Sequence, residues 1–194
     1  MIHSVCVFCG SSVGRRPEYQ RAAQEMGTLL AQRNIRLIYG GGNVGLMGAL
    51  AEACLAAGGA VTGVIPQALG DKELAHWGLT ELHIVKSMHE RKARMAELAG
   101  AFIALPGGFG TIEEFFEVLT WTQLGLQRKA CGLVNVLGYY DSLLAQADRA
   151  AEDGFLQPPH REMVVAAGSP AAVLEMVLHF NPPSLPKWGN YDTT

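Results

Sequence analysis

The sequence predicts an α/β fold in which an open parallel sheet lies between two layers of helices. Three observations support this prediction. Short apolar runs alternate with amphipathic stretches along most of the 194 residues, as in a sheet whose parallel strands are joined by helices. The apolar runs are nearly continuous, which is expected of strands covered on both faces. Several of them end in glycine-rich segments, as strands do where they lead into ligand-binding loops.

The first half of the chain supplies four of the predicted strands. Each is a short apolar run bounded by glycine or polar residues, and they lie at 4–10, 35–42, 60–66 and 81–87. Helical periodicity of apolar residues fills the intervals, at about 17–33, 44–58 and 88–100.

The second half continues the alternation, with strands at 101–108, 131–136 and 163–168 and helices at 111–124, 139–153 and 169–180. The last helix has Ser169 as its N-cap and Pro170 at its first position. The pattern predicts one Rossmann-like domain over residues 1–180, a three-layer sandwich. Residues 181–194 contain three prolines and end in polar residues, so we expect an irregular C-terminal extension there.

Composition argues against several classes of function. Fifteen Lys and Arg stand against 18 Asp and Glu, a net charge of −3, so we expect no nucleic-acid partner. No apolar stretch reaches the roughly 18 residues of a membrane helix, so we expect no membrane partner. The first residues lack the basic and apolar regions of a signal peptide, which predicts a cytoplasmic protein with reduced cysteines.

Cys6 and Cys9 form a C-x-x-C pair, and redox or metal chemistry is one interpretation of such a pair. A redox pair opens a helix after a strand, whereas this pair falls inside a predicted strand, where residues three apart face opposite sides. We therefore interpret both as small apolar core residues. The six histidines are scattered without metal-ligand spacing, so we expect no metal site.

Two glycine-rich loops predict a ligand that carries phosphate. They are "YGGGNVGLMG" (39–48) and "LPGGFGTIEE" (105–114), and each joins a predicted strand to a helix. Glycine lets a ligand approach the backbone amides, and a helix N-terminus attracts anions. Gly40, Gly42 and Gly45 fit G-x-G-x-x-G, but no acidic residue ends the next strand, which disfavours NAD or FAD. G-K-[ST] is absent too, which disfavours a P-loop NTPase.

Arg91 interrupts an apolar stripe of Met88, Met95 and Leu98 in the helix at 88–100. A cation near a helix N-terminus is also unfavourable for the helix dipole. Two interpretations remain open: the arginine pairs with a structural carboxylate, or it points into a ligand cleft.

Glu113 and Glu114 open the helix at 111–124, and they also allow two interpretations. Thr111 with Glu114 is T-x-x-E, a capping box in which Glu114 bonds a backbone amide. Alternatively, Glu114 and Arg91 lie at one edge of the sheet, because their helices follow successive strands. A carboxylate that activates water and a cation beside a phosphate site would then suit hydrolysis of a sugar bond.

These segments carry a family resemblance. "PGGFGTIEE" fits P-G-G-x-G-T-x-x-E, and "MHERK", "CGSS" and "YGGGNVGLMG" precede it. Over about residues 4–180 the chain closely resembles the Lonely Guy family of cytokinin-activating phosphoribohydrolases, often labelled lysine decarboxylase-like. The resemblance implies hydrolysis of the N-glycosidic bond of purine 5′-monophosphates, N6-modified adenosine monophosphates and AMP among them, to free base and ribose 5-phosphate. Residues 1–180 would then be one nucleotide-binding catalytic domain.

The resemblance also implies site residues. Arg91 and Glu114 match the catalytic pair. The matched nucleotide contacts are Glu73, Lys92, Gly108, Phe109, Gly110, Thr111, Ile112, Glu113 and Thr120. Ser11 and the loop that contains Gly41 and Gly42 are expected to line the same pocket. A homodimer is implied as well, with its interface near the site and Thr120, while the neighbouring Trp121 belongs either to that surface or to the core.

Two other functions are alternatives to hydrolysis. A pyridoxal phosphate decarboxylase needs a Schiff-base lysine, and none of the five lysines lies in a loop with an evident pyridinium partner; we therefore expect no cofactor. A carrier or sensor would bind a phosphorylated cofactor without turnover, and it would not need both Arg91 and Glu114. The preferred base, adenine or an N6-prenylated adenine, depends on the shape of the pocket rather than on a sequence motif.

Overall fold

The computed structural model describes residues 2–70 and 74–183. Within these residues seven parallel strands form one sheet in the order β4-β3-β2-β1-β5-β6-β7. They are β1 (Ser4–Phe8), β2 (Arg36–Tyr39), β3 (Val61–Pro66), β4 (Glu81–Val85), β5 (Ala101–Ala104), β6 (Cys131–Val134) and β7 (Val164–Ala167). All seven were predicted, although several end earlier than expected because the glycines that follow them form loops.

The helices fill the intervals between the strands. They are α1 (Pro17–Gln32), α2 (Gly45–Ala56), α3 (Gln67–Leu69), α4 (Met88–Leu98), α5 (Phe109–Gln123), η2 (Val136–Gly138), α6 (Asp141–Glu152), α7 (Pro158–Arg161) and α8 (Pro170–His179). The predicted cap of α8 is confirmed, because Ser169 Oγ accepts a hydrogen bond from the amide of Ala172 at 3.3 Å. The short elements α3, η2 and α7 were not predicted. The proposed C-terminal extension falls mostly outside the described residues.

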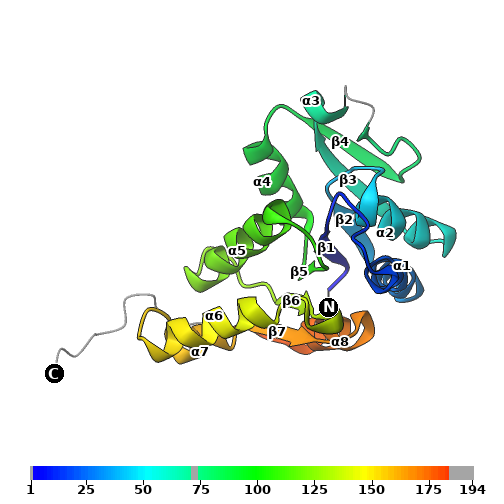
Figure 1. Cartoon of the computed structure of the whole chain (residues 1–194). Coiled ribbons are helices and arrows are strands. Elements are labelled where there is room, and N and C mark those ends of the chain that lie inside the picture. Colours follow the sequence, from blue (N-terminus) through cyan, green and yellow to red (C-terminus); the bar gives the residue numbers. More distant parts are fainter. Residues whose placement is uncertain (1, 71–73, 184–194) are drawn as a thin grey trace.

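The sheet divides the core into two layers, and Figure 1 shows helices on both sides of it. Val5 and Val7 of β1 pack with α1, α2 and α8, whereas Cys6 and Phe8 pack with α4 and α5. The three-layer α/β prediction is thus confirmed. Cys6 and Cys9 belong to different layers, and the four cysteines are free and buried, as the interpretation of apolar core residues required.

The strand order reverses direction beside β1. From β1, successive strands β2, β3 and β4 are added on one side of the sheet. The next strand, β5, pairs with the other side of β1. The carboxyl ends of β1 and β5 are neighbours, with Phe8 paired to Ala104. Open α/β sheets bind ligands at such a switch point, outside the carboxyl ends of the strands.

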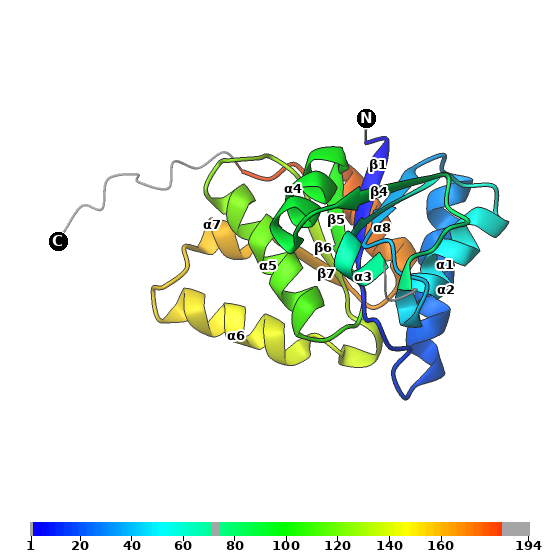
Figure 2. The ribbon, with the colours of Figure 1, turned by 90° about the horizontal axis from the view of Figure 1, so that it is seen from above.

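Helix α4 is the element that brings distant strands together. It follows β4 at the sheet edge, yet it contacts β3, β2 and β1 as it crosses back over the sheet. Figure 2 shows α4 and α5 on the same side of the sheet. The first turns of both helices therefore reach one region, even though three strands separate β4 from β5. No described helix combines the length and the apolar character needed to cross a bilayer.

Candidate active site

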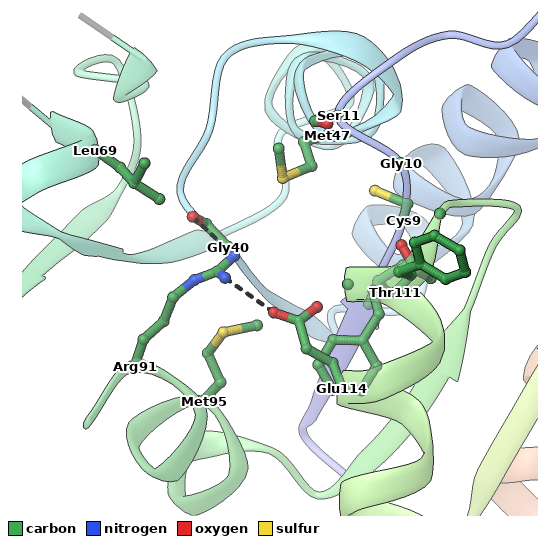
Figure 3. A pocket seen from close by; sticks show the side chains of 15 residues that line it. Cys9, Gly10, Ser11, Gly40, Met47, Leu69, Arg91, Met95, Thr111 and Glu114 are labelled. Atoms are coloured by element: carbon green, nitrogen blue, oxygen red, sulfur yellow. Dashed lines mark hydrogen bonds and ion pairs between the residues drawn. The ribbon is translucent and has the colours of Figure 1, made fainter. Parts of the chain in front are cut away.

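A cavity of about 350 Å³ opens at the switch point between β1 and β5. Its volume lies within the range of about 300 to 1,000 Å³ that is usual for small-molecule sites. The lining residues are Val7, Phe8, Cys9, Gly10, Ser11, Gly40, Met47, Leu69, Arg91, Met95, Gly108, Phe109, Gly110, Thr111 and Glu114. Figure 3 shows Arg91 and Glu114 pointing toward each other in this cavity.

Arg91 is held by the ends of two strands as well as by Glu114. Its Nε donates to the carbonyl of Val64 at 3.1 Å and its Nη2 to the carbonyl of Gly40 at 3.4 Å, while Nη1 donates to Glu114 Oε1 at 2.9 Å. Only 8% of Arg91 is exposed. Three bonds from one planar guanidinium fix its orientation, which a lysine could not reproduce.

Gly40 is required by this arrangement. A Cβ at position 40 would overlap Nη2 of Arg91. The first glycine of the "YGGG" segment therefore makes room for a side chain from a helix 51 residues away. The sequence pattern predicts that this loop lets a ligand approach, whereas the group that a Cβ at position 40 would meet is the arginine.

Glu114 is buried beside the cavity, with 8% of the residue exposed. Burial raises the pKa of its carboxyl group, because a charge is costly away from water, and the nearby Arg91 cation opposes this shift. One carboxylate oxygen accepts from Arg91. Among the described residues no donor bonds the other oxygen, so it is available to a ligand or a water molecule.

The capping-box interpretation of Thr111 and Glu114 is wrong. Helix α5 begins at Phe109, two residues earlier than predicted, and its N-cap is Gly108, which has no side-chain cap. Thr111 is therefore inside the first turn, and Glu114 is occupied by Arg91 rather than by a backbone amide. Both open interpretations of Arg91 hold together: it lines the cavity and it pairs with a buried carboxylate.

The N-terminus of α5 faces the cavity and has the properties of an anion site. Gly108, Phe109, Gly110 and Thr111 all line the cavity. The first helical hydrogen bond runs from the amide of Ile112 to Gly108. The amides of the three residues between them thus have no partner within the helix, and the helix dipole adds a partial positive charge.

Seven of the residues implied by the family resemblance line this cavity, namely Ser11, Arg91, Gly108, Phe109, Gly110, Thr111 and Glu114. Gly41 and Ile112 are adjacent in sequence to lining residues, and Gly42 is two residues from Gly40, but none of the three lines the cavity. Glu73 lies outside the described residues. Thr120 lies elsewhere in the chain, beside a small separate cavity of about 90 Å³ with Phe116 and His160.

Lys92 and Glu113 form a second ion pair outside the cavity. Lys92 Nζ donates to Glu113 Oε1 at 2.5 Å and to Glu117 Oε1 at 3.1 Å. The hydrogen bond to Glu113 raises the pKa of Lys92. Trp121, further along α5, packs partly buried against the core layer of α4 and α5.

Sequence reasoning did not name several lining residues. Met47 and Leu69 form apolar walls, and Cys9 and Gly10 extend the cavity along the end of β1 (Figure 3). The sequence pattern did indicate Met95, because it lies in the same apolar stripe as Arg91, one helical turn later. Burial raises the pKa of the Cys9 thiol well above its usual range, so this cysteine is a neutral wall residue.

The residues of the cavity do not fit pyridoxal phosphate chemistry. No lysine of the described chain lines the cavity, and the nearest lysine along the helix, Lys92, is engaged by two carboxylates. The described residues also contain no group of three or more His, Cys, Asp or Glu side chains able to hold a metal ion.

Comparison with known proteins relates the chain to one family of enzymes. Residues 47–177 match a family model described as "Possible lysine decarboxylase". The chain is 55% identical over 163 residues to a cytokinin riboside 5′-monophosphate phosphoribohydrolase of Rhodococcoides fascians, covering 84% of this chain and 82% of that protein. It is 51% identical over 179 residues to a probable enzyme of the same name from Oryza sativa subsp. japonica, covering 92% and 73%.

Solved structures of a different kind of protein share the fold. A molybdenum cofactor carrier protein from Chlamydomonas reinhardtii superposes with a TM-score of 0.68, at 18% identity, over 91% of this chain and 98% of that chain. At this identity the likeness concerns the fold alone.

Proposed function

The chain belongs to the family whose curated members are named cytokinin riboside 5′-monophosphate phosphoribohydrolases, and from this membership we propose that it hydrolyses the N-glycosidic bond of N6-modified adenosine 5′-monophosphates and of AMP. Water and the nucleotide give the free base and ribose 5-phosphate. The observation that carries the proposal for this chain is the buried pair of Arg91 and Glu114 beside the N-terminus of α5 in one cavity.

Each part of the cavity supplies one requirement of the reaction. The amides at the start of α5 hold the 5′-phosphate, as helix N-termini do for anions. Cleavage builds positive charge on the sugar, as in other glycoside hydrolyses. The Glu114 carboxylate stabilises that charge, and its second oxygen orients and deprotonates the attacking water. Its raised pKa makes it a stronger base than an exposed carboxylate.

Arg91 favours the ionised form of Glu114, which is the form that can act as a base. Its cation opposes the shift that burial causes in the pKa of Glu114, and its bonds to two strand carbonyls hold it in place while the carboxylate changes charge. Its charge also offsets the negative charge that develops on the departing base.

A direct test is incubation with AMP and with isopentenyladenosine monophosphate, followed by chromatography of the released base. Adenosine is the matched control, because it lacks only the phosphate that α5 holds. We expect release from the monophosphates and little from adenosine. Absence of release from every purine monophosphate in a panel would refute hydrolysis, and retention of an unhydrolysed nucleotide through purification would favour a carrier. Relative rates in the same panel would report the preferred base.

A homodimer is part of the same proposal. On α5, Phe109 and Phe116 are exposed apolar side chains seven residues apart, with exposed fractions of 94% and 37%, so they lie on one helix face. A second copy covering that face would bring its own groups near the cavity mouth and near Thr120. Light scattering at micromolar concentration tests this, and a monomeric mass would count against it.

A further inference from the structure

The loop that leads into α5 has four successive carbonyl groups, and each already has a donor. Leu105 O accepts from the Tyr140 hydroxyl at 2.7 Å, and Gly107 O accepts from the Tyr139 hydroxyl at 2.6 Å. Pro106 O accepts from the amide of Gly10 at 3.1 Å, and Gly108 O from the amide of Ile112 at 3.2 Å. The loop therefore turns its acceptors toward protein donors.

The bond from Tyr139 determines where one amide points. In a trans peptide the C=O and the following N–H lie on opposite sides of the chain, so a Gly107 carbonyl directed at Tyr139 directs the Gly108 amide the other way. Tyr139 and Gly107 line a second hollow of about 310 Å³ on one side of the loop, whereas Gly108 also lines the cavity of Arg91 and Glu114. Among the described residues no acceptor bonds the Gly108 amide.

Both residues of this peptide unit are glycines, so the unit could rotate at little cost if nothing held it. Rotation would turn the Gly107 carbonyl toward the cavity and replace a donor by an acceptor at the start of α5. An anion there would then meet a partial negative charge.

We propose that Tyr139 is a positioning residue for the substrate's phosphate: its hydroxyl holds the Gly107–Gly108 peptide so that the Gly108 amide faces the anion bound at the start of α5. The proposal rests on the proposed function for the identity of that anion, a 5′-phosphomonoester. Tyr139 comes from the turn before α6 and is not among the residues that line the cavity of Arg91 and Glu114.

Tyr140 is a natural control on the adjacent residue. It makes the same kind of bond to Leu105 O, but the residue after Leu105 is Pro106, which has no amide hydrogen to aim. Tyr140 is also buried, with 2% exposed, whereas Tyr139 is 40% exposed. Loss of the Tyr140 hydroxyl should therefore reduce stability, because it leaves a buried carbonyl unpaired, without changing phosphate affinity.

The test compares Tyr139→Phe and Tyr140→Phe by calorimetric titration with ribose 5-phosphate and with inorganic phosphate. We expect Tyr139→Phe to weaken both ligands about tenfold, the scale of one hydrogen bond to a charged group, with an unchanged melting temperature. Tyr140→Phe should melt earlier and bind within about twofold of wild type. In turnover, Tyr139→Phe should raise KM for AMP while kcat at saturation is retained.

A second variant distinguishes rotation of the Gly107–Gly108 peptide from a general increase in the flexibility of the loop. A Cβ at Gly108 meets no atom of the described residues within 4 Å, so Gly108→Ala fits there. Alanine disfavours the positive φ that rotation of this peptide would require at residue 108. In the Gly108→Ala background, Tyr139→Phe should reduce phosphate affinity by a clearly smaller factor than in the wild-type background. A double-mutant cycle of the titrations measures this difference.

The outcomes are separable from those of the proposed function. Equal phosphate affinity in wild type and Tyr139→Phe, equal weakening by both tyrosine variants, or no phosphate binding by the wild type would each overturn the inference, even if AMP is hydrolysed. Weakening confined to Tyr139→Phe would support it even if no monophosphate is turned over, in which case only the proposed function fails.

Discussion

Two adjacent cations of α4, Arg91 and Lys92, form ion pairs with α5 that differ in their surroundings. Arg91 and Glu114 form the inner pair, and both side chains are 10% exposed. Lys92, whose side chain is 12% exposed, forms the outer pair with Glu113, whose side chain is 57% exposed, and also pairs with Glu117. Arg91 of the inner pair also donates to two backbone carbonyls and lines the cavity. Lys92, among the described residues, donates only to the carboxylates of Glu113 and Glu117.

The difference shows that the register of a helix decides which of two neighbouring carboxylates is placed for chemistry. Consecutive residues on a helix point about 100° apart, so Glu114 enters the layer between helix and sheet while Glu113 remains at the rim. Burial then raises the pKa of Glu114. A charged group kept out of water is held in one orientation and interacts strongly with a bound ligand.

Replacing the two glutamates by glutamine should give the largest contrast. Glu114→Gln keeps the shape of the side chain but cannot accept a proton, so we expect kcat to fall by about 10²- to 10⁴-fold, the usual contribution of a general base. Nucleotide affinity should persist. Glu113→Gln should lower kcat by less than about tenfold, since an ion pair at the rim of the cavity contributes little. Initial rates of base release, with nucleotide binding by titration, would measure both; a Glu114→Gln enzyme with normal turnover would remove that residue from the mechanism.

The two cations provide the next contrast. Arg91→Lys keeps the charge but loses the fork that reaches Val64, Gly40 and Glu114 together, so we expect kcat to fall about 10²-fold through misplacement. Lys92→Arg keeps a positive charge beside exposed Glu113, so its kcat should stay within about threefold of the wild-type value. Similar losses in both variants would mean that the inner pair has no special role.

The pH profile distinguishes the same cations by their effect on Glu114. Activity needs ionised Glu114, so it should rise as pH increases through a pKa that burial has raised. Arg91 lowers that pKa more than Lys92 does, so Arg91→Gln should move the acid limb of residual kcat to higher pH, and Lys92→Gln should move it less. The residual rates are measured between about pH 4 and 9. A limb that stays in place in Arg91→Gln would show that another group titrates.

The sequence predicts part of this arrangement. The strands, their helices and the approach of Arg91 to Glu114 were predicted from apolar periodicity and from loops at one sheet edge. The structure brings the two residues together differently, because three strands lie between β4 and β5 and α4 crosses back over the sheet toward α5. Strand order depends on long-range packing, which a local pattern does not contain.

The start of α5 and the need for glycine at position 40 could not be predicted from local sequence pattern, because both depend on tertiary contacts. Gly108 and Gly110 have poor helix propensity, so the pattern placed the helix start at Thr111. Tertiary hydrogen bonds to the preceding carbonyls hold the turn instead. The need for glycine at 40 follows from a guanidinium that is distant in sequence, and only the folded chain brings them together.

Gly40→Ala tests the inner pair without touching either charged residue. The new methyl group would displace the Arg91 guanidinium, and we expect kcat to fall about tenfold or more, as misplacement of a catalytic group by about 1 Å can cost. Gly168→Ala is a matched control, because a Cβ there meets nothing within 4 Å in the part of the chain that the structure describes. Thermal melts should show both variants folded. Wild-type kcat in Gly40→Ala would mean that the arginine adapts and that its position is not critical.

The outer pair should affect stability slightly and in a pH-dependent way. Lys92→Met removes bonds to Glu113 and Glu117, and such partly exposed pairs contribute at most about 1 kcal/mol to unfolding free energy. Because the pKa of Lys92 is raised in the folded chain above its ordinary value of 10.5, the contribution is fully present below that value and is lost as pH rises through the folded pKa. Urea unfolding at pH 7 and at about pH 11 should therefore show a smaller difference between variant and wild type at the higher pH. A difference of several kcal/mol at neutral pH would instead mean that the outer pair supports the fold as strongly as buried pairs do, and the contrast between the two pairs would then rest on chemistry alone.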